Sequence, residues 1–440
     1  MTALPSTLTQ LQRKIAGKAL SAQEAWQLQL GRRDALNARW HCLSQPLGSE
    51  GQADSRGPLA GIALAHKDNL DTWNRRSGCG VGRGESQQGL APAWAIGALQ
   101  RAGAGHLGTT VMPELACGAT STNPRFEPCV NPLDPRAVVG GSSSGSAVAV
   151  AGGMAYGSLG SDTAGSVRIP AATCGLVGLK TTLGLIPTQG LTPLAPSLDT
   201  IGILARTVED LAQLLGPVAP DLTTAQPGTP PRLRIWIPAG WLHEEVALAL
   251  ETMGREVNAE SADLGDDHMH LSALSEIVMQ TELARLQQGP LLAGQLGPGV
   301  QALALPGLVT PPAWAEAALA VRCAELRRFC QTWLPQGEVL MMPALARPVP
   351  DRSAAEPGEP HFEPRELLAL HRTMGFINYL GLPAVVLPIA RDRRGLPISV
   401  QLVGRPFHEN TLLAVASQLQ ERRFGSAGFL PDWHMAHTEN

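Results

Sequence analysis

Apolar positions in the first part of the chain alternate between helical spacing and short continuous runs. Leucine and isoleucine recur at helical spacing over residues 8–15, which predicts an N-terminal helix. An apolar run at 62–65 predicts a strand that leads directly into Lys67. Residues 91–104 have the spacing of an amphipathic helix, and a turn with a short strand is expected after it, within 104–110.

The rest of the chain continues this alternation. The expected elements are a strand at 232–237, a mostly helical region at 271–333 that is interrupted at 306–314, a buried strand at 338–343, two strands within 378–404 joined by a charged turn, and a closing helix at 408–423. Polar loops are expected at 48–57 and, rich in Pro and Thr, at 217–232. Strands and helices that alternate throughout indicate an α/β fold.

Composition supports a large globular protein. The 440 residues are 44% hydrophobic and 16% charged, and the net charge is −4, so we expect neither a disordered chain nor a nucleic-acid partner. Residues 137–161 carry no charge and are long enough to cross a bilayer. Their first half is dominated by Gly and Ser, however, so we expect a helix packed inside the protein and no membrane contact.

The cysteines and histidines suggest no metal site. The seven cysteines are spread along the chain without a CxxC pair, which favours free thiols in a reducing, cytoplasmic setting. His268 and His270 lie in DDHMH, which we interpret as a solvated loop. The N-terminus lacks the apolar core of a signal peptide.

Three segments have residue types that packing alone explains poorly. Lys67 ends an apolar strand in AHKDN, where partial desolvation would favour a neutral amine that can act as a base, although a lysine that extends to solvent fits the same pattern. Residues 140–146, GGSSSGS, precede an apolar helix and can bind an anion or form a turn with a helix cap. Residues 160–170, GSDTAGSVRIP, place Ser166 beside small residues whose amides can hold an oxyanion.

Together these segments resemble the amidase signature family. That family has a lysine in a K-D-N context, a GGSS-[GS]-GS loop and a G-[ST]-D-x-x-GS-[IV]-R-x-P segment, and all three occur here in order. Ser142 follows Lys67 by 75 residues and Ser166 follows Ser142 by 24, as in the family. The resemblance is strong over residues 55–210, moderate over 335–425 and weak over 215–333, where such enzymes differ in substrate recognition.

The resemblance implies a Ser–cis-Ser–Lys triad. Ser166 would be the nucleophile, Ser142 the bridging serine on a cis peptide, and Lys67 the base. The implied oxyanion hole consists of backbone amides of the loop that contains the nucleophile: Thr163, Ala164, Gly165 and Ser166. The residues expected to support the site without binding substrate are Gly141, Ser143, Asp162 and Arg168. Ala164 stands where the family often has Gly, so its methyl group would narrow the acyl pocket.

The resemblance also implies the fold. We expect a single compact α/β/α domain around a large twisted mixed β-sheet. Residues 1–55 would form an N-terminal helical arm, and residues 56–440 the amidase signature domain. Its core would span 56–212 and 335–425, with 215–333 as a variable, cap-like segment.

The function implied is hydrolysis of a small-molecule carboxylic amide to a carboxylate and ammonia or an amine, through a Ser166 acyl-enzyme. No cofactor or metal is expected; the expected partner is the amide substrate, and a homodimer is left open. The alternative is the glutamine-hydrolysing subunit of a tRNA-dependent amidotransferase complex, which uses the same triad. A third hypothesis is a non-catalytic scaffold protein with the same fold. The presence of all three triad residues disfavours it.

Overall fold

The computed structural model describes residues 4–47, 51, 53–54, 56–82, 84–222 and 230–430. Parts of the two expected polar loops therefore lie outside the described residues. Within the described ranges, no helix combines the length and apolar character needed to span a bilayer. The uncharged stretch 137–161 instead forms a short buried helix and most of a strand.

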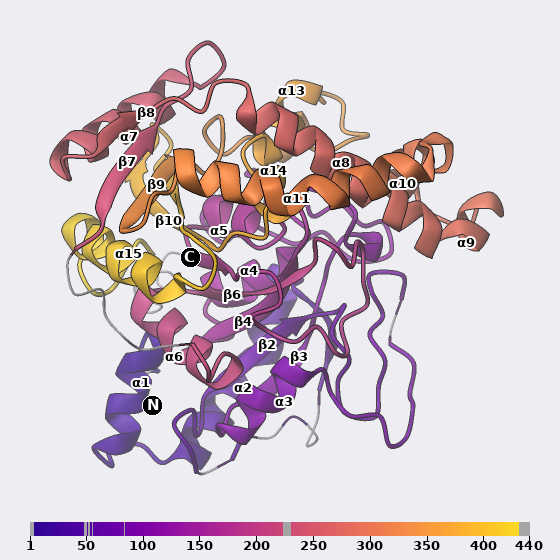
Figure 1. The fold of residues 1–440 in the computed structure, drawn as a ribbon. Helices are drawn as coiled ribbons and strands as arrows, with labels where there is room; N and C mark the ends of the chain where they lie inside the picture. Colours follow the sequence, from indigo (N-terminus) through magenta and orange to yellow (C-terminus); the bar gives the residue numbers. More distant parts are fainter. Residues whose placement is uncertain are drawn as a thin grey trace.

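A mixed sheet of eight strands runs through the described part of the chain (Figure 1). Its order is β4-β6-β5-β10-β11-β9-β7-β8; β7 pairs in parallel with β8 and β9, and the other neighbours are antiparallel. The strands are β4 (Gly157–Asp162), β5 (Val177–Lys180), β6 (Thr200–Ala205), β7 (Arg232–Trp236), β8 (Glu260–Ala262), β9 (Glu338–Pro343), β10 (Ala384–Arg391) and β11 (Pro397–Val403).

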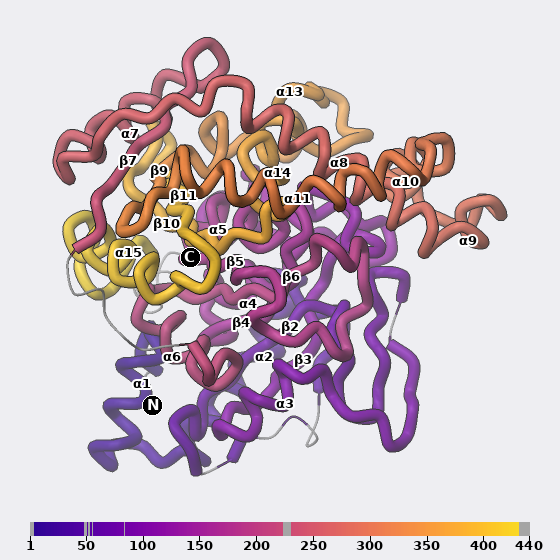
Figure 2. The backbone as a smooth tube through the Cα atoms, viewed as in Figure 1, coloured from indigo at the N-terminus to yellow at the C-terminus, as the bar shows by residue number. Residues whose placement is uncertain are grey.

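Three further strands form a small sheet beside β4. In it β1 (Leu43–Pro46) is antiparallel and β2 (Ala63–Lys67) parallel to β3 (Gly105–Thr110). The Tyr156 amide donates to the Ala63 carbonyl at 3.0 Å, and the two traces run close together in Figure 2. This contact joins the first residue of β2 to the residue before β4. Lys67, at the end of β2, then lies beside the end of β4.

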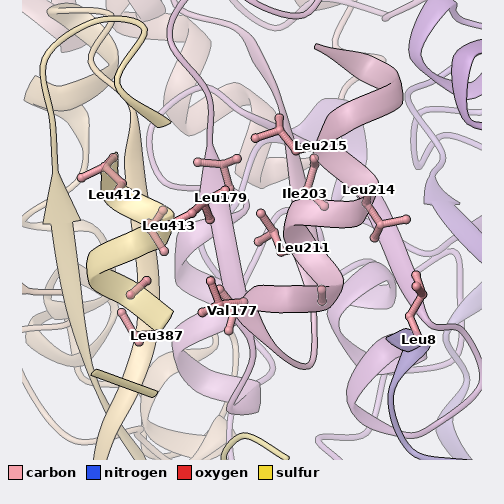
Figure 3. Close-up of a cluster of buried hydrophobic side chains, with 14 of the residues drawn as sticks. Leu8, Val177, Leu179, Ile203, Leu211, Leu214, Leu215, Leu387, Leu412 and Leu413 are labelled. Atoms are coloured by element: carbon pink, nitrogen blue, oxygen red, sulfur yellow. The ribbon is translucent and has the colours of Figure 1, made fainter. Parts of the chain in front are cut away.

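Helices cover both faces of the large sheet. On one face lie α6 (Val208–Val218), α7 (Glu244–Glu256) and α15 (Glu409–Phe424), and on the other α4 (Ser144–Ala151) and α5 (Arg168–Cys174). Successive side chains of a strand point to opposite faces, so Val385 and Val386 of β10 belong to different hydrophobic clusters. Figure 3 shows the first cluster, with Val177, Leu179 and Ile203 of the strands against leucines of α6 and α15. The expected α/β/α arrangement around a mixed sheet is confirmed.

Several expected elements are present with shifted ends. The strand at 62–67 is β2, the strand pair within 378–404 is the β10–β11 hairpin, and the interruption at 306–314 separates two helices. The remaining helices are α1 (Leu8–Ala16), α2 (Ala22–Trp40), α3 (Trp94–Arg101), α8 (Asp267–Leu286), α9 (Gln288–Leu292), α10 (Pro298–Val309), α11 (Pro312–Thr332), α12 (Arg352–Ala355), α13 (Pro364–His371) and α14 (Gly375–Tyr379), with a 3₁₀ turn at Glu114–Ala116.

Two segments are organised differently from the expectation. The N-terminal segment is not wholly helical, because β1 pairs with β3 and its flanking residue Cys42 is buried in the core. The segment 215–333 is not wholly a cap, since β7 and β8 extend the large sheet and α7 packs on it. Helices α8 to α11 form a separate helical layer, which packs through Leu271 and Val278 against Phe376 of α14.

The close approach of α5 to the sheet depends on glycine. A Cβ atom added at Gly178 of β5 would lie 2.6 Å from the Ala171 Cβ of α5. We predict that Gly178→Ala lowers the free energy of unfolding by about 1–3 kcal/mol, because the overpacked helix must shift. Gly31→Ala in α2, where an added Cβ would meet nothing within 4 Å outside its own helix, is the control and is expected to be neutral or to stabilise by up to about 1 kcal/mol. Urea denaturation measures both, and equal effects would contradict this packing argument.

Candidate active site

Lys67 is fully buried at the end of β2, where its amine is surrounded by serine oxygens. Its Nζ lies 2.7 Å from Ser142 Oγ and 2.8 Å from Ser161 Oγ. Burial lowers the pKa of Lys67 to about 8, although Cys79, Asp162, Asp199 and Cys117 act in the opposite direction. A minor fraction of the amine is therefore neutral at pH 7, far more than for an ordinary lysine.

Ser142 follows the cis peptide Gly141–Ser142, as the resemblance implied. A Cβ atom at Gly141 would lie 2.2 Å from the Thr120 carbonyl oxygen, so only glycine fits beside that loop. The next residue, Ser143, is buried and donates its amide to the Ser166 carbonyl at 3.0 Å. That hydrogen bond brings the glycine/serine loop and the loop after β4 together.

Ser166 lies between β4 and α5, at an opening in an otherwise buried segment. Of residues 157–174, all are buried except Ala164 and Ser166, which are partly exposed. Gly165 between them has φ +112, and a Cβ there would meet the Met374 side chain. The turn at Gly165 thus leaves the two neighbouring residues accessible from outside.

Asp162 and Arg168 form a fully buried ion pair beneath this turn. Arg168 Nη2 lies 2.9 Å from Asp162 Oδ1, and its Nε lies 3.0 Å from Oδ2. Burial alone would raise the pKa of Asp162, but the Arg168 guanidinium holds it well below its usual range. The carboxylate also accepts the Gly165 amide at 2.8 Å and the Val167 amide at 3.1 Å, so the turn is folded around it.

This arrangement corrects one element of the expected oxyanion hole. The Gly165 amide is already hydrogen-bonded to Asp162, because the turn wraps around that carboxylate. Of the four amides expected, those of Thr163, Ala164 and Ser166 remain as proposed donors. The Thr163 side chain is also fixed, since its hydroxyl donates to Asp199 at 2.5 Å.

Sequence reasoning missed several buried polar residues at the site. Ser161 and Asn69 are joined at 2.8 Å next to Lys67, and they could have been suspected because they adjoin motif residues. Asn378 and Gln401 bind Arg168 from segments more than 200 residues away, and no local pattern reveals that. Lys180, a second buried lysine, donates hydrogen bonds to the Thr181 and Leu382 carbonyls. The bond to Leu382 joins β5 to the loop before β10.

The two histidines of the DDHMH segment belong to α8 rather than to a loop. His268 is buried, with Nδ1 2.9 Å from the Gly265 carbonyl, which corrects its interpretation as a solvated loop residue. Over the described residues, no group of His, Cys, Asp and Glu side chains has the makeup of a metal site.

Comparisons with known proteins agree with this description. The family model described as Amidase matches residues 42–232 and 310–413, and the unmatched middle is narrower than the interval expected from the sequence. A glutamyl-tRNA(Gln) amidotransferase subunit of Carboxydothermus hydrogenoformans is 30% identical, over 93% of this chain and 95% of its own.

Solved structures are similar over nearly the whole chain. A structure described as an amidase has a TM-score of 0.83 and 28% identity, and covers 95% of this chain and 100% of its own. A glutamyl-tRNA(Gln) amidotransferase subunit of Thermotoga maritima has a TM-score of 0.78 and 25% identity, with 97% of each chain covered. Fold and family model together define the class of protein as a hydrolase of carbon–nitrogen bonds. The chain belongs to the amidase signature family.

The Asp162–Arg168 pair gives a testable prediction about stability. Asp162→Asn leaves the Arg168 charge buried without its partner, so we expect a loss of about 3–5 kcal/mol in the free energy of unfolding. Glu363→Gln breaks a comparable pair with Arg365 whose side chains are 49% and 70% exposed, and should cost about 1 kcal/mol or less. Chemical denaturation of both variants measures the contrast; similar losses would show that burial of the first pair has no special consequence.

Proposed function

We propose that the protein is a serine amidase in which Lys67, Ser142 and Ser166 carry the reaction. The observation that carries this proposal is the 2.7 Å contact between the buried Lys67 amine and the hydroxyl of Ser142. The amide of the next residue, Ser143, is held against Ser166, which is accessible while its surroundings are buried. The direct Lys67–Ser142 contact and the main-chain bond from Ser143 to the Ser166 carbonyl support the assignment of these three residues to one site.

The proposed proton path uses only these side chains. Neutral Lys67 takes a proton from Ser142, and Ser142 takes one from Ser166. As Ser166 loses its proton, the Ser166 Oγ forms a bond to the amide carbonyl carbon. The amides of Thr163, Ala164 and Ser166 would stabilise the oxyanion. The carbon–nitrogen bond then breaks, with the proton returned through Ser142 to the leaving nitrogen. A water molecule then attacks the acyl-enzyme and gives up a proton along the same path. The bond to Ser166 Oγ breaks, which releases the carboxylate and free Ser166.

The proposed substrate is a small-molecule amide that yields a carboxylate and ammonia or an amine. Ala164 is partly exposed and packs against the hydrophobic cluster that contains Phe376 of α14 and residues of α8–α11, so its methyl group would limit the acyl side of the pocket. The helical layer α8–α11 is the part of the structure most suited to recognising the rest of the substrate, because much of it lies outside the family match. A cytoplasmic setting with free thiols remains part of this proposal.

A second candidate is the glutamine-hydrolysing subunit of an amidotransferase, favoured by the names of the relatives. Both candidates share the triad, so they differ in substrate and partners. The chain is purified alone and ammonia release is measured from glutamine and from a panel of aliphatic, aryl and urea-like amides. Turnover of panel amides without glutaminase activity supports the first candidate. Glutamine hydrolysis that requires added protein subunits supports the second.

Ser166→Ala is expected to abolish turnover and covalent labelling by a fluorophosphonate, because it removes the nucleophilic oxygen. Mass spectrometry of a labelled peptide in the wild-type protein should place the adduct on Ser166. Ser158→Ala, which removes a hydroxyl on the buried strand β4 bonded to the Leu159 carbonyl, is the control and should still be labelled. Labelling that persists in the Ser166 variant would assign the nucleophile elsewhere.

The Lys67 base predicts a pH dependence. Its pKa near 8 means that the amine is protonated and inactive below that value, so kcat/KM should rise with pH and level off above about 8. Lys67→Arg should lose most of the rate and the rising limb despite keeping the charge, because a guanidinium does not deprotonate in proteins. Near-normal turnover of that variant over the pH range would make Lys67 an electrostatic residue only.

A further inference from the structure

Main-chain amides around Ser166 lack an acceptor within the described ranges of the chain. There, the N–H groups of Thr163, Ala164 and Ser166 donate to no carbonyl or side chain, whereas the Gly165 amide between them donates to Asp162 Oδ1. Thr163 is only 2% exposed. A buried N–H without an acceptor costs free energy, so such groups are rare in folded proteins. Next to a nucleophile, an amide in this state is suited to bind an oxyanion.

The direction of the Thr163 N–H is set by the peptide that joins it to Asp162. Among the described residues, the cis peptides are limited to Gly141–Ser142, so this peptide is trans. A trans peptide is planar, and its N–H points opposite to its C=O. Asp162 ends β4 and pairs with Thr200, the first residue of β6, so the chain leaves the sheet at this peptide. Any group that holds the Asp162 carbonyl therefore also aims the Thr163 N–H.

Two buried side chains hold the Asp162 carbonyl. Thr200 Oγ1 donates to its oxygen at 3.0 Å, and Asn378 Nδ2 donates to it at 2.9 Å. A carbonyl oxygen can only accept, so the Thr200 hydroxyl must be the donor, and its proton points at the carbonyl. Thr200 is 2% exposed and Asn378 is fully buried, so water does not compete for either hydrogen bond.

The residue before Thr200 holds the Thr163 side chain. Asp199 Oδ1 accepts the Thr163 hydroxyl at 2.5 Å, and its Oδ2 accepts two main-chain amides of the preceding loop. Both oxygens of this carboxylate are engaged, so the Thr163 side chain is fixed. The hydrogen bonds to the Asp162 carbonyl then keep the adjoining peptide plane from turning.

We propose that Thr200 is a positioning residue of the oxyanion hole, which acts through the Asp162 carbonyl to aim the Thr163 N–H at the oxyanion. This inference rests on the proposed function, because it assumes that Ser166 attacks an amide carbonyl and that Thr163 is an oxyanion donor. Thr200 itself takes no part in bond making. Asn378 makes the same contact but also supports the buried ion pair, so a change at Thr200 tests the carbonyl contact alone.

Thr200→Val is nearly isosteric and removes the hydroxyl. With one of its two side-chain donors lost, the Asp162 carbonyl can turn, and the Thr163 N–H with it. We expect kcat on the best panel amide to fall by about 10-fold while KM changes by less than about twofold, because an oxyanion donor acts mainly in the transition state. The loss is smaller than that for a deleted donor, since the N–H is still present.

Thr200→Ser keeps the hydroxyl and provides the rescue. Its kcat should lie within about twofold of wild type, because the serine Oγ can donate to the same carbonyl. A valine variant with wild-type kcat, or a serine variant as slow as the valine variant, would overturn the proposal.

A trifluoromethyl ketone with the acyl part of the best panel amide gives an independent readout. Ser166 Oγ forms a bond to its carbonyl carbon and passes its proton to Ser142, and the carbonyl oxygen becomes the oxyanion. In Thr200→Val the Ki of this ketone should rise by about the factor by which kcat/KM falls, since both measure stabilisation of a tetrahedral oxyanion. An unchanged Ki with a lowered kcat would place the effect of Thr200 outside the oxyanion hole and contradict the proposal.

Thr181→Val is the matched control on the same strand pair. Thr181 is 1% exposed, and its hydroxyl donates to the Ile201 carbonyl of β6 at 2.8 Å, so the variant also removes a buried bond from a hydroxyl to a main-chain carbonyl. Its melting temperature should fall about as much as that of Thr200→Val, with kcat and Ki near wild type. An equal loss of kcat in both variants would mean that buried hydroxyls support the rate through stability alone, and would overturn the proposal.

The proposed function and the role of Thr200 fail in different ways. If the wild-type protein is not labelled at Ser166 by a fluorophosphonate, the proposed function is rejected. If the wild-type protein is labelled there but Thr200→Val retains its kcat and Ki, only the role of Thr200 is rejected.

Discussion

The site depends on one buried ion pair, that between Asp162 and Arg168. Two charges removed from water are costly, and their mutual attraction offsets that cost only when the remaining donors and acceptors are also satisfied. Here Asp162 accepts the Gly165 and Val167 amides, and Arg168 donates to Gln401 and Asn378. The pair therefore defines the shape of the turn that carries Ser166 and fastens it to β11 and α14. Its main consequence is conformational specificity, rather than a large gain in stability.

Burial disfavours the charged form of both Asp162 and Lys67, but the two side chains have different partners. Asp162 faces a guanidinium at two contacts, so its charged form is favoured. Lys67 faces hydroxyl and carbonyl oxygens, and the carboxylates that act on it are engaged with other partners. Desolvation of the ammonium is therefore only partly compensated, and its pKa falls to about 8. One fold thus keeps the Asp162 carboxyl ionised and makes the Lys67 amine easier to deprotonate than an ordinary lysine.

The sequence revealed the parts of the site that are local in the chain. Lys67, Ser142 and Ser166 each lie in a short segment of unusual residue types, so their chemistry could be inferred before the fold was known. The apolar runs also predicted β2, β9, the β10–β11 hairpin and α15, but they gave no prediction for other elements such as α2, β4, β5 and β6. Asn378 and Gln401 could not be found in this way, since each lies in an ordinary apolar context and meets Arg168 only through the sheet order. For the same reason, nothing local showed that β7 would join the large sheet and bring β8 with it, because its neighbour β9 lies about 100 residues further along.

The helical layer is joined to the loop before β6 mainly through main-chain atoms of that loop. Glu282 of α8 accepts the amide and hydroxyl of Ser197, and Arg322 of α11 donates to the Ser197 carbonyl. Two residues later, Asp199 accepts the Thr163 hydroxyl and the amides of Leu194 and Ala195. Most of these bonds end on main-chain atoms, which every sequence provides. Other side chains of the helical layer can therefore change without removing these bonds, which depend on Glu282 and Arg322. The family match omits residues 233–309, which include α8 with Glu282, but it includes α11 with Arg322.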